Sequence, residues 1–310
     1  MPAGVSAMPA VVWAFTDGKA GHENQTRGLV QALAHTAAMD VHWIEPLRGK
    51  AWVLAALRGR FPTTDALPNP DLLIGAGHAT HLSLLLARRV RGGRSVVLMN
   101  PSLPRRWFDL CVIPEHDQVA PAANVLTTRG ALTAVTPGYG SDPSTGLLLI
   151  GGPSSHYNWS DSDMVAQVVA IVRRELGTRW TLTTSRRTPP STLALLQDIH
   201  ASNLVIVPFE DTDRQWLPAQ LARVATVWVS QDSVSMVYEA LTAGAATGLL
   251  EVPRRTANRI VRAMHNLVRD KLVVDFSAWQ NGTSPAPNAT TFNEAARVAA
   301  WIRTTWLHGR

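Results

Sequence analysis

The sequence predicts an α/β protein with two units, each built on a doubly wound parallel sheet. The chain has 310 residues, which is more than one hydrophobic core usually serves. Short β-branched runs recur about every 20–35 residues, and most are followed by a segment of helical periodicity, as in parallel sheets. A stretch rich in Pro, Gly and Ser at 133–146 separates two such series and is typical of an interdomain linker.

The first series contains five expected strands with amphipathic helices between them. Two helical stripes are visible, one near 29–34 and one near 82–90, where apolar residues recur with helical spacing. The expected strands are 11–15, 41–44, 72–75, 95–99 and 110–113.

The second series repeats the pattern and ends in a polar stretch after residue 275. Its expected strands are 147–150, 180–183, 204–207, 227–230 and 248–252, and its expected helices lie near 161–176, 190–200, 215–223, 233–243 and 257–270. A last amphipathic helix is expected near 291–307. The predicted domains are therefore 1–140, 141–290 and the terminal helix of 291–310. Since such sheets bind ligands beyond the carboxyl ends of their strands, a cleft between the domains is where chemistry is expected.

Composition excludes several classes of protein. Hydrophobic residues make up 46% and charged residues 17%, as in globular rather than disordered chains. One cysteine cannot form an internal disulfide, and there is neither a signal peptide nor an apolar run of membrane-spanning length. We expect a cytoplasmic protein, peripheral at a membrane surface if it touches one. The net charge of +6 favours phosphate or anionic-lipid partners but is too small to predict nucleic-acid binding.

The segment DGKAGHENQTRG at 17–28 follows the first expected strand and is the first candidate site. His22 is suited to act as base or proton donor, with Asp17 orienting it and Lys19 countering negative charge. Asn24 and Gln25 in the same turn are predicted to face the acceptor. The alternative is a solvated turn capped by the aspartate.

The segment GAGHATH at 75–81 follows another strand and opens a helix. It has Gly-x-Gly but Thr80 where a dinucleotide fingerprint has its third glycine, which disfavours a Rossmann dehydrogenase. His78 either lines the acceptor side of the cleft or is a structural histidine at a helix start.

Two segments of the second half are candidates for holding a phosphate. In GGPSSHYNWSDSD (151–163), the backbone amides of Gly151 and Gly152 and the Ser154 hydroxyl are predicted to face an anion, while Ser160 and Asp163 resemble a capping box. In TSRRTPP (184–190), two arginines either clamp a phosphate or are solvated. These are Arg186 and Arg187.

The segment VSQDSVSMVYEALTAG (229–244) combines a strand end with a helix start. Ser233, Val234 and Ser235 are predicted to hold a diphosphate at the helix N-terminus. Glu239 lies one to two turns further on and is suited to accept hydrogen bonds from ribose hydroxyls. The alternative for Glu239 is an ordinary surface carboxylate.

Several of these motifs together resemble a known family. The strand, Ser-rich helix start and Glu followed by Ala-x-x-Ala-Gly resemble the donor motif of GT-B glycosyltransferases. DGKAGHENQTRGL, GGPSSHYNW, SRRTPP and QDSVSMVYEA together resemble the mitochondrial fission factor family of the plant "elongated mitochondria" type and its bacterial homologues. The resemblance implies a GT-B-like fold, two Rossmann-like domains facing across a cleft with the last helix crossing back to the first, and places Phe209 near the nucleotide base.

The leading hypothesis is a metal-independent transferase that uses a nucleoside-diphosphate sugar and no cofactor. Asp-x-Asp pairs at 161/163 and 211/213 keep a metal-dependent alternative open. Epimerase chemistry of the short-chain dehydrogenase kind needs Tyr-x-x-x-Lys, which no tyrosine of this chain provides. A GT-B-fold, non-hydrolysing nucleoside-diphosphate-sugar epimerase, the description often given to bacterial members, remains an alternative.

A non-catalytic adaptor is the third class, since the plant members of the resembled family recruit a dynamin-related protein to the mitochondrial outer membrane. It would have a protein partner. The segment WVLAALRGRF at 52–61 combines an apolar run with two arginines, and either docks on anionic lipid or is a core helix. Further arginines in the same domain are at 88, 89, 91, 94, 105 and 106. Lipid binding would equally suit an enzyme with a lipid-linked acceptor.

Overall fold

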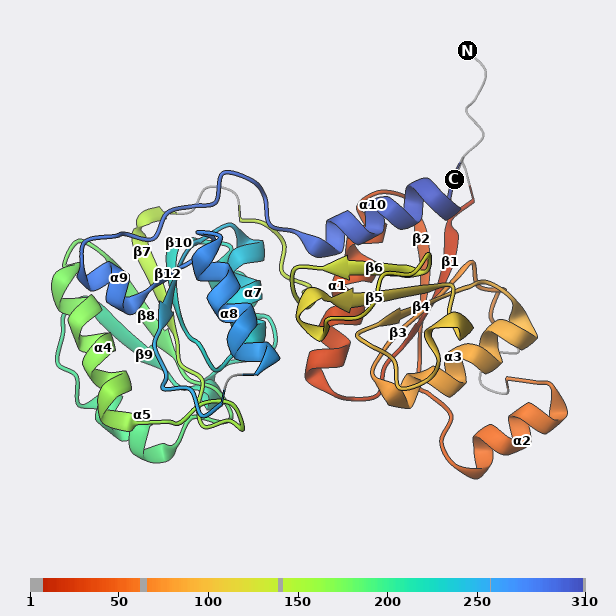
Figure 1. The fold of residues 1–310 in the computed structure, drawn as a ribbon, viewed down its shortest axis with the longest axis horizontal. Coiled ribbons are helices and arrows are strands. Elements are labelled where there is room, and N and C mark those ends of the chain that lie inside the picture. Colours follow the sequence, from red (N-terminus) through yellow and green to blue (C-terminus); the bar gives the residue numbers. More distant parts are fainter. Residues whose placement is uncertain (1–7, 62–65, 139–141, 257, 309–310) are drawn as a thin grey trace, which may run out of the picture. The chain divides into compact units, whose positions relative to one another are not determined.

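A computed structural model describes residues 8–61, 66–138, 142–256 and 258–308 (Figure 1). The chain divides into two compact units, which are described separately. Unit 1 comprises Met1–Ala134 with Glu294–Arg310, and unit 2 comprises Val135–Asn293. The domain boundary expected between residues 140 and 141 lies outside the described residues.

Unit 1 contains a parallel sheet of six strands in the order β2-β1-β3-β4-β5-β6. The strands are β1 (Ala10–Phe15), β2 (Met39–Ile44), β3 (Leu72–Ala76), β4 (Arg94–Leu98), β5 (Leu110–Pro114) and β6 (Val125–Thr128). The helices are α1 (Ala20–Ala34), α2 (Lys50–Arg58), α3 (His78–Arg91) and α10 (Glu294–Trp306), with 3-10 turns at Arg105–Trp107 and Glu115–Asp117. All five expected strands are present, and β6 adds an unpredicted sixth.

Helices cover both faces of this sheet because its strands are apolar on both sides. Side chains of α1 and α10, including Leu29 and Ile302, are buried with Val12 against one face. Trp13 and Phe15, which alternate with Val12 along β1, are buried with residues of α2 and α3. The last helix of the chain therefore packs in unit 1, as the GT-B-like fold class predicts.

Unit 2 contains a second parallel sheet of six strands, in the order β12-β11-β10-β7-β8-β9. The strands are β7 (Asp142–Leu149), β8 (Arg179–Thr183), β9 (Leu204–Val207), β10 (Val224–Ser230), β11 (Ala246–Leu250) and β12 (Val274–Asp275). The helices are α4 (Asp161–Arg174), α5 (Pro190–Gln197), α6 (Trp216–Leu221), α7 (Val234–Ala243), α8 (Arg259–Arg269) and α9 (Phe276–Gln280), with a 3-10 turn at Phe209–Asp211.

The stretch 133–146 is not a linker throughout, because residues 142–146 belong to β7. β7 is a central strand that pairs with β10 on one side and β8 on the other, so its backbone has ladder partners on both edges. These pairings override the turn propensity of Pro and Ser. Gly146 fits the strand because the indole of Trp180 occupies the space that a Cβ would take.

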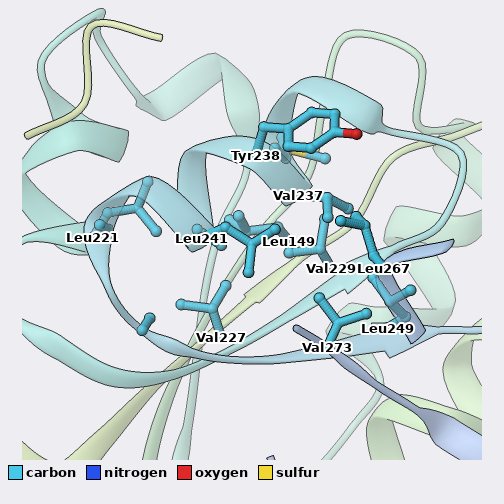
Figure 2. Close-up of a cluster of buried hydrophobic side chains, with 14 of the residues drawn as sticks. Leu149, Leu221, Val227, Val229, Val237, Tyr238, Leu241, Leu249, Leu267 and Val273 are labelled. Atoms are coloured by element: carbon cyan, nitrogen blue, oxygen red, sulfur yellow. The ribbon is translucent and has the colours of Figure 1, made fainter. Parts of the chain in front are cut away.

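A buried cluster fixes α7 against the sheet of unit 2 (Figure 2). Val237 and Leu241 of α7 contact the strand residues Leu149, Val229 and Leu249, which are all fully buried. Because α7 follows β10 directly, this packing sets where the helix N-terminus lies relative to the strand ends. That position matters for the candidate site below.

Within the described ranges, every helix is too short or too polar to cross a bilayer.

Candidate functional site

Four of the five candidate segments lie at the carboxyl ends of the strands that flank the switch point of each sheet, and the fifth, 184–190, follows β8. In unit 1 the strand order reverses between β1 and β3, and in unit 2 it reverses between β7 and β10. Connections at such a point leave for opposite faces of the sheet, so the carboxyl ends of the two strands form the usual ligand position of an open α/β sheet. Segments 17–28 and 75–81 follow β1 and β3; segments 151–163 and 229–244 follow β7 and β10.

In unit 1, Asp17 and His22 form a hydrogen-bonded pair. Asp17 Oδ2 lies 2.9 Å from His22 Nδ1, and the exposed fractions of the two side chains are 1% and 18%. Burial raises the pKa of Asp17, but hydrogen bonds from His22 and the Lys19 amide outweigh it and leave that pKa below 3.8. An ionised Asp17 holds the proton on Nδ1, so the basic lone pair of the ring is on Nε2. The Lys19 side chain itself is exposed.

The ring of His22 lies directly against the backbone of Gly77. A Cβ on Gly77 would overlap the imidazole, and the φ of +83° at this residue is one that other residues rarely adopt. Gly77 caps the start of α3, so the segments after β1 and β3 meet here. Gly77, the second glycine of the 75–81 segment, therefore leaves room for the His22 ring beside α3.

Two further histidines follow β3. His78 is exposed, whereas His81 is only 2% exposed, with its Nδ1 3.3 Å from the Ser102 hydroxyl and its ring edge-on to Phe108. Burial, followed by the proximity of His78 and His22, lowers the pKa of His81 to about 4. Sequence reasoning did not select His81. The sequence pattern that could have indicated His81 is its position three residues after His78, which places both histidines on one side of the helix start.

Two of the residues expected on the acceptor side are engaged inside unit 1. Asn24 Oδ1 accepts a hydrogen bond of 3.1 Å from the Ala134 amide, and Gln25 is buried in α1. A cavity of about 510 Å³ instead opens beside Asp17, at the ends of β1 and β2. Its polar lining includes Glu23, Glu45 and Arg48, so it presents charges of both signs.

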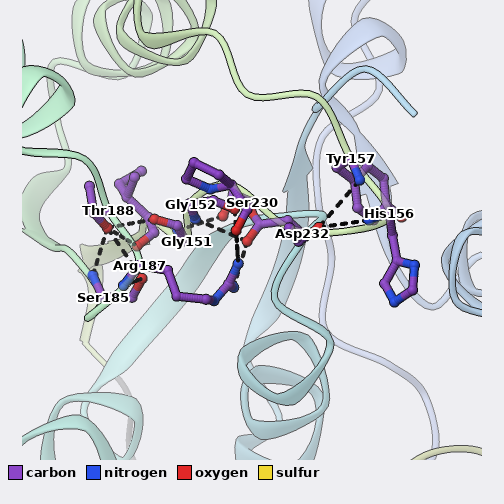
Figure 3. Close-up of polar contacts among 12 residues, drawn as sticks. Gly151, Gly152, His156, Tyr157, Ser185, Arg187, Thr188, Ser230 and Asp232 are labelled. Atoms are coloured by element: carbon purple, nitrogen blue, oxygen red, sulfur yellow. Dashed lines mark hydrogen bonds and ion pairs between the residues drawn. The ribbon is translucent and has the colours of Figure 1, made fainter. Parts of the chain in front are cut away.

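In unit 2, the segments after β7, β8 and β10 meet at the carboxylate of Asp232 (Figure 3). This side chain has no exposed surface, and its Oδ2 accepts from the Gly152 amide at 3.0 Å and from Arg187 Nη2 at 2.6 Å. Its Oδ1 is buried without a hydrogen-bond partner in the described part of the chain. No local pattern in the sequence indicates this role of Asp232, because its partners are 45 and 80 residues away.

The phosphate-facing amides expected at Gly151 and Gly152 are already used. Gly151 N donates to the Ser230 hydroxyl at 2.7 Å, and Gly152 N donates to Asp232. Arg187 does not project as a clamp either, because its guanidinium also donates to the carbonyls of Gly152 and Pro153. Buried polar groups demand such partners, so these residues hold the loops together instead of facing a ligand.

Ser154 is likewise engaged, because its hydroxyl accepts from the backbone amides of His156 and Tyr157, each at 3.2 Å. Arg186 is exposed, with its guanidinium carbon 5.7 Å from the centroid of the Phe209 ring. The structure thus brings together Arg186 and Phe209, which sequence reasoning assigned to phosphate and base respectively.

The N-terminus of α7 is the other part of unit 2 suited to an anion. Ser233 caps the helix without a side-chain hydrogen bond in the described residues, so no hydroxyl competes for the first-turn amides. Ser233 is 8% exposed, Val234 is half-buried and Ser235 is exposed. Glu239 follows Ser235 by one turn and is half-buried, so both lie on one side of the helix.

Two of the four Asp-x-Asp carboxylates, those of Asp161 and Asp213, have structural partners. The Asp163 amide donates to Ser160, which confirms the predicted cap, and Asp161 accepts from Trp159 Nε1 and the Thr192 hydroxyl. Hydrogen bonds from Ser191 and Thr192 lower the pKa of Asp161. Asp213 accepts from the backbone amides that begin α6. Within the described ranges, no group of three His, Cys, Asp or Glu side chains is arranged to hold a metal ion.

Two parallel-sheet units, each with polar residues at its switch point and with the last helix returned to unit 1, define a protein of the GT-B-like class. The motifs of the two halves narrow this class further. The chain belongs to the mitochondrial fission ELM1 family, whose model matches residues 20–306.

The chain is also similar to individual proteins. Uncharacterized protein RP120 of Rickettsia prowazekii is 22% identical over 261 residues, which cover 69% of this chain and 73% of that protein. Among solved structures, a Listeria monocytogenes protein assigned as a UDP-N-acetylglucosamine 2-epimerase is 13% identical, with a TM-score of 0.58 and 98% of each chain covered.

The Neisseria meningitidis UDP-GlcNAc 2-epimerase, solved with UDP-GlcNAc bound, is 10% identical, with a TM-score of 0.52 and coverage of 97% of this chain and 100% of that one. At these identities the two structures show a shared fold.

Proposed function

We propose that this protein is a GT-B-type glycosyltransferase that uses a nucleoside-diphosphate sugar and requires no metal ion. The observation that carries the proposal is the hydrogen bond between buried Asp17 and His22 at the switch point of unit 1. A histidine held on one nitrogen by an ionised carboxylate is suited to take a proton on the other nitrogen. His22 is therefore the general base, Asp17 orients it, and Lys19 adds positive charge nearby.

Unit 2 supplies the donor site in this proposal. The amides of Val234 and Ser235 and the hydroxyls of Ser233 and Ser235 hold the diphosphate at the N-terminus of α7, because this helix end has no side-chain cap among the described residues. The Ser233 amide is not available, since it donates to the Ser230 carbonyl. Glu239 accepts hydrogen bonds from the ribose. Arg186 faces the phosphates or the base from its place over Phe209.

Four of the residues first assigned to the donor act indirectly in this account. Gly151, Gly152 and Ser154 shape the loop after β7, and Arg187 ties that loop to Asp232. They position the strand ends next to α7 without touching the diphosphate. Their substitution should therefore change stability together with binding.

The reaction follows from these roles. The acceptor hydroxyl gives its proton to Nε2 of His22, and its oxygen forms a bond to the anomeric carbon of the donor sugar. The bond from that carbon to the diphosphate breaks, and the nucleoside diphosphate leaves with both bonding electrons. The α7 amides and Arg186 stabilise the charge that develops on the leaving oxygen, the role a metal ion fills in other transferases.

Release of nucleoside diphosphate from a panel of nucleotide sugars, measured in chelator, tests the proposal. Uridine nucleotides are the first to try, because the similar Neisseria structure holds UDP-GlcNAc. His22→Gln should lower turnover about 100-fold or more with little change in nucleotide affinity. His200→Gln, which changes an exposed histidine of unit 2, is the matched control. Failure to bind any nucleotide would refute the proposal.

An epimerase is the second candidate, favoured by the second accessible histidine that follows β3, His78. In this reaction one group removes the C2 proton while the C1–O bond to the nucleoside diphosphate breaks and a C1=C2 double bond forms. The nucleoside diphosphate then adds back to C1 while a second group delivers a proton to C2 from the other face, so two acid–base groups are needed. His22 and His78 are the side chains suited to these roles. In D₂O this reaction incorporates deuterium at C2 and yields the C2 epimer, which NMR distinguishes from transfer.

A non-catalytic adaptor would bind a protein partner, turn over no sugar, and tolerate His22→Gln without loss of partner binding. If the protein is instead a transferase that acts at an anionic membrane surface, a lipid-linked molecule is the class of acceptor it would use.

A further inference from the structure

Helix α2 of unit 1 is built with its apolar face turned outward. Val53 is 50% exposed, Leu54 48% and Leu57 81%, whereas Ala55 on the opposite side is 3% exposed. At 100° per residue the three large side chains share one face, and the small residue faces the sheet. A surface helix of a globular unit normally has the reverse arrangement. The exposed face is therefore contrary to what folding alone would favour.

Contacts on the inner side hold α2 in this orientation. The Trp52 indole packs with the core cluster of unit 1, and its Nε1 donates to the carbonyl of Leu82 at 3.1 Å. Leu82 belongs to α3, is itself 44% exposed, and extends the apolar area beyond α2. Figure 1 shows α2 next to α3 at the periphery of unit 1. Trp52 therefore fixes the orientation of α2, and the helix is firmly attached with its apolar face outward.

Basic residues flank this face at both ends. Arg48 and Lys50 precede or begin the helix, Arg58 and Arg60 end it, and all four are exposed. No acidic residue occurs from position 46 to position 61. A lysine in the first turn is unfavourable next to the positive end of the helix dipole, so the stability of the fold does not explain Lys50. Attraction to an anionic surface beneath the helix explains it.

We propose that α2 is a membrane-surface anchor that lies in the interface of an anionic bilayer. Val53, Leu54 and Leu57 enter the acyl boundary, while Lys50 and Arg58 reach the lipid phosphates. The helix has nine residues and is about 14 Å long, which is too short to cross the hydrocarbon core and suited to lying in its surface.

The flanking charge favours a bilayer over a second copy of the chain. An antiparallel pairing of two α2 helices would bring Lys50 of one copy to Arg58 of the other, and like charges in contact repel. A bilayer with anionic lipid complements the same charges. The inference does not depend on the proposed enzymatic activity.

Flotation of the full chain with vesicles tests the proposal. We expect binding to phosphatidylcholine vesicles that contain about 30% phosphatidylglycerol, with weak binding to phosphatidylcholine alone. The variant Val53→Ser/Leu54→Ser/Leu57→Ser should lose binding by about 100-fold, since each large side chain contributes up to about tenfold. Lys50→Gln/Arg58→Gln should lose about 25-fold on the mixed vesicles, about fivefold per charge.

The matched control is Leu176→Ser/Val205→Ser, which removes apolar side chains of unit 2 that are 75% and 61% exposed. It should bind as the unaltered chain does. Thermal unfolding establishes that each variant is folded, which is expected because every substituted side chain is exposed. Equal binding by the α2 variant and the control would overturn the proposal.

A dye on Leu57→Cys provides a second readout. Cys111 has no exposed surface, so a thiol-reactive dye labels the introduced residue. Its emission should shift to the blue only with anionic vesicles. An unchanged spectrum, or failure of the unaltered chain to float with any vesicle, would overturn the proposal. If the serine variant instead converted an oligomer to a monomer and vesicles had no effect, α2 would be an interface between copies and the proposal would be wrong.

Discussion

Protonation of His81 should cost unit 1 a measurable part of its stability between pH 7 and pH 4.5. The side chain is 2% exposed and lies against Phe108 and Ser102, so the folded unit holds the neutral imidazole. Its pKa falls from 6.5 in an unfolded chain to about 4 in the fold. Since the unfolded chain binds the proton more tightly across that range, stability is present above pH 6.5 and is lost as the pH falls toward 4.

The pKa difference gives the size of the effect. At pH 4.5 the unfolded chain is nearly all protonated at this site and the folded chain is mostly neutral, which amounts to about 2.5 kcal/mol. At pH 7 the same difference is about 0.2 kcal/mol. We therefore expect the free energy of unfolding of unit 1 to drop by about 2 kcal/mol through His81 alone.

Urea unfolding followed by circular dichroism at pH 7 and pH 4.5 measures this quantity. The His81→Gln variant keeps a polar side chain but cannot titrate, so its free energy of unfolding should fall by about 2 kcal/mol less than that of the unaltered chain. Titration of the His81 Cε1 proton by NMR should give a midpoint near 4. A midpoint near 6.5, or equal pH dependence in the two proteins, would show that the folded unit does not hold His81 neutral.

Three further outcomes are expected. Arg187→Ala should lower the free energy of unfolding of unit 2 by about 2–3 kcal/mol in urea, because it leaves the buried Asp232 carboxylate without its cation. A smaller loss in the double variant Arg187→Ala/Asp232→Asn would support this cause. Gly152→Ala should cost about 3 kcal/mol, since a Cβ there overlaps the Arg187 carbonyl, whereas Gly177→Ala, with open space around it, should change stability by less than about 1 kcal/mol. Burial raises the pKa of the Cys111 thiol to about 11, so a thiol reagent at pH 7.4 should label it only in denaturant; rapid labelling of the native chain would contradict the structure.

The strands and the ends of the sheets that carry the candidate residues were predictable from the sequence. β3 and β5 are buried along their whole length and β1 at every position except Val11, so each is a continuous apolar run. Strands of two to four residues with half-polar sequences, such as β6 and β12, do not give this signal. The first residues of β7 were hidden for a different reason, because their partners in β8 and β10 determine their conformation.

The internal contacts of the site were less predictable. A glycine pair after a strand has the same local pattern whether its amides face a ligand or the protein. At Gly152 the deciding partner, Asp232, lies 80 residues away, and only the fold brings it within 3.0 Å. The Asp17–His22 pair was predictable because its members are five residues apart in one segment.

For α2, the spacing of apolar residues in the sequence does not determine which side of the helix faces the core. The apolar residues of 52–57 occupy both sides of the helix, so the sequence left a core helix and a lipid-docking helix equally open. Trp52 decides between the two faces through its contact with α3.

Isothermal titration of the full chain with UDP, GDP and ADP in the presence of a chelator measures directly whether α7 begins a donor site. We expect at least one nucleoside diphosphate to bind at a single site, and Glu239→Gln to weaken that binding about tenfold or more by removing the ribose contact. Absence of binding for every nucleotide, or binding to Glu239→Gln with unchanged affinity, would contradict a donor site at the start of α7.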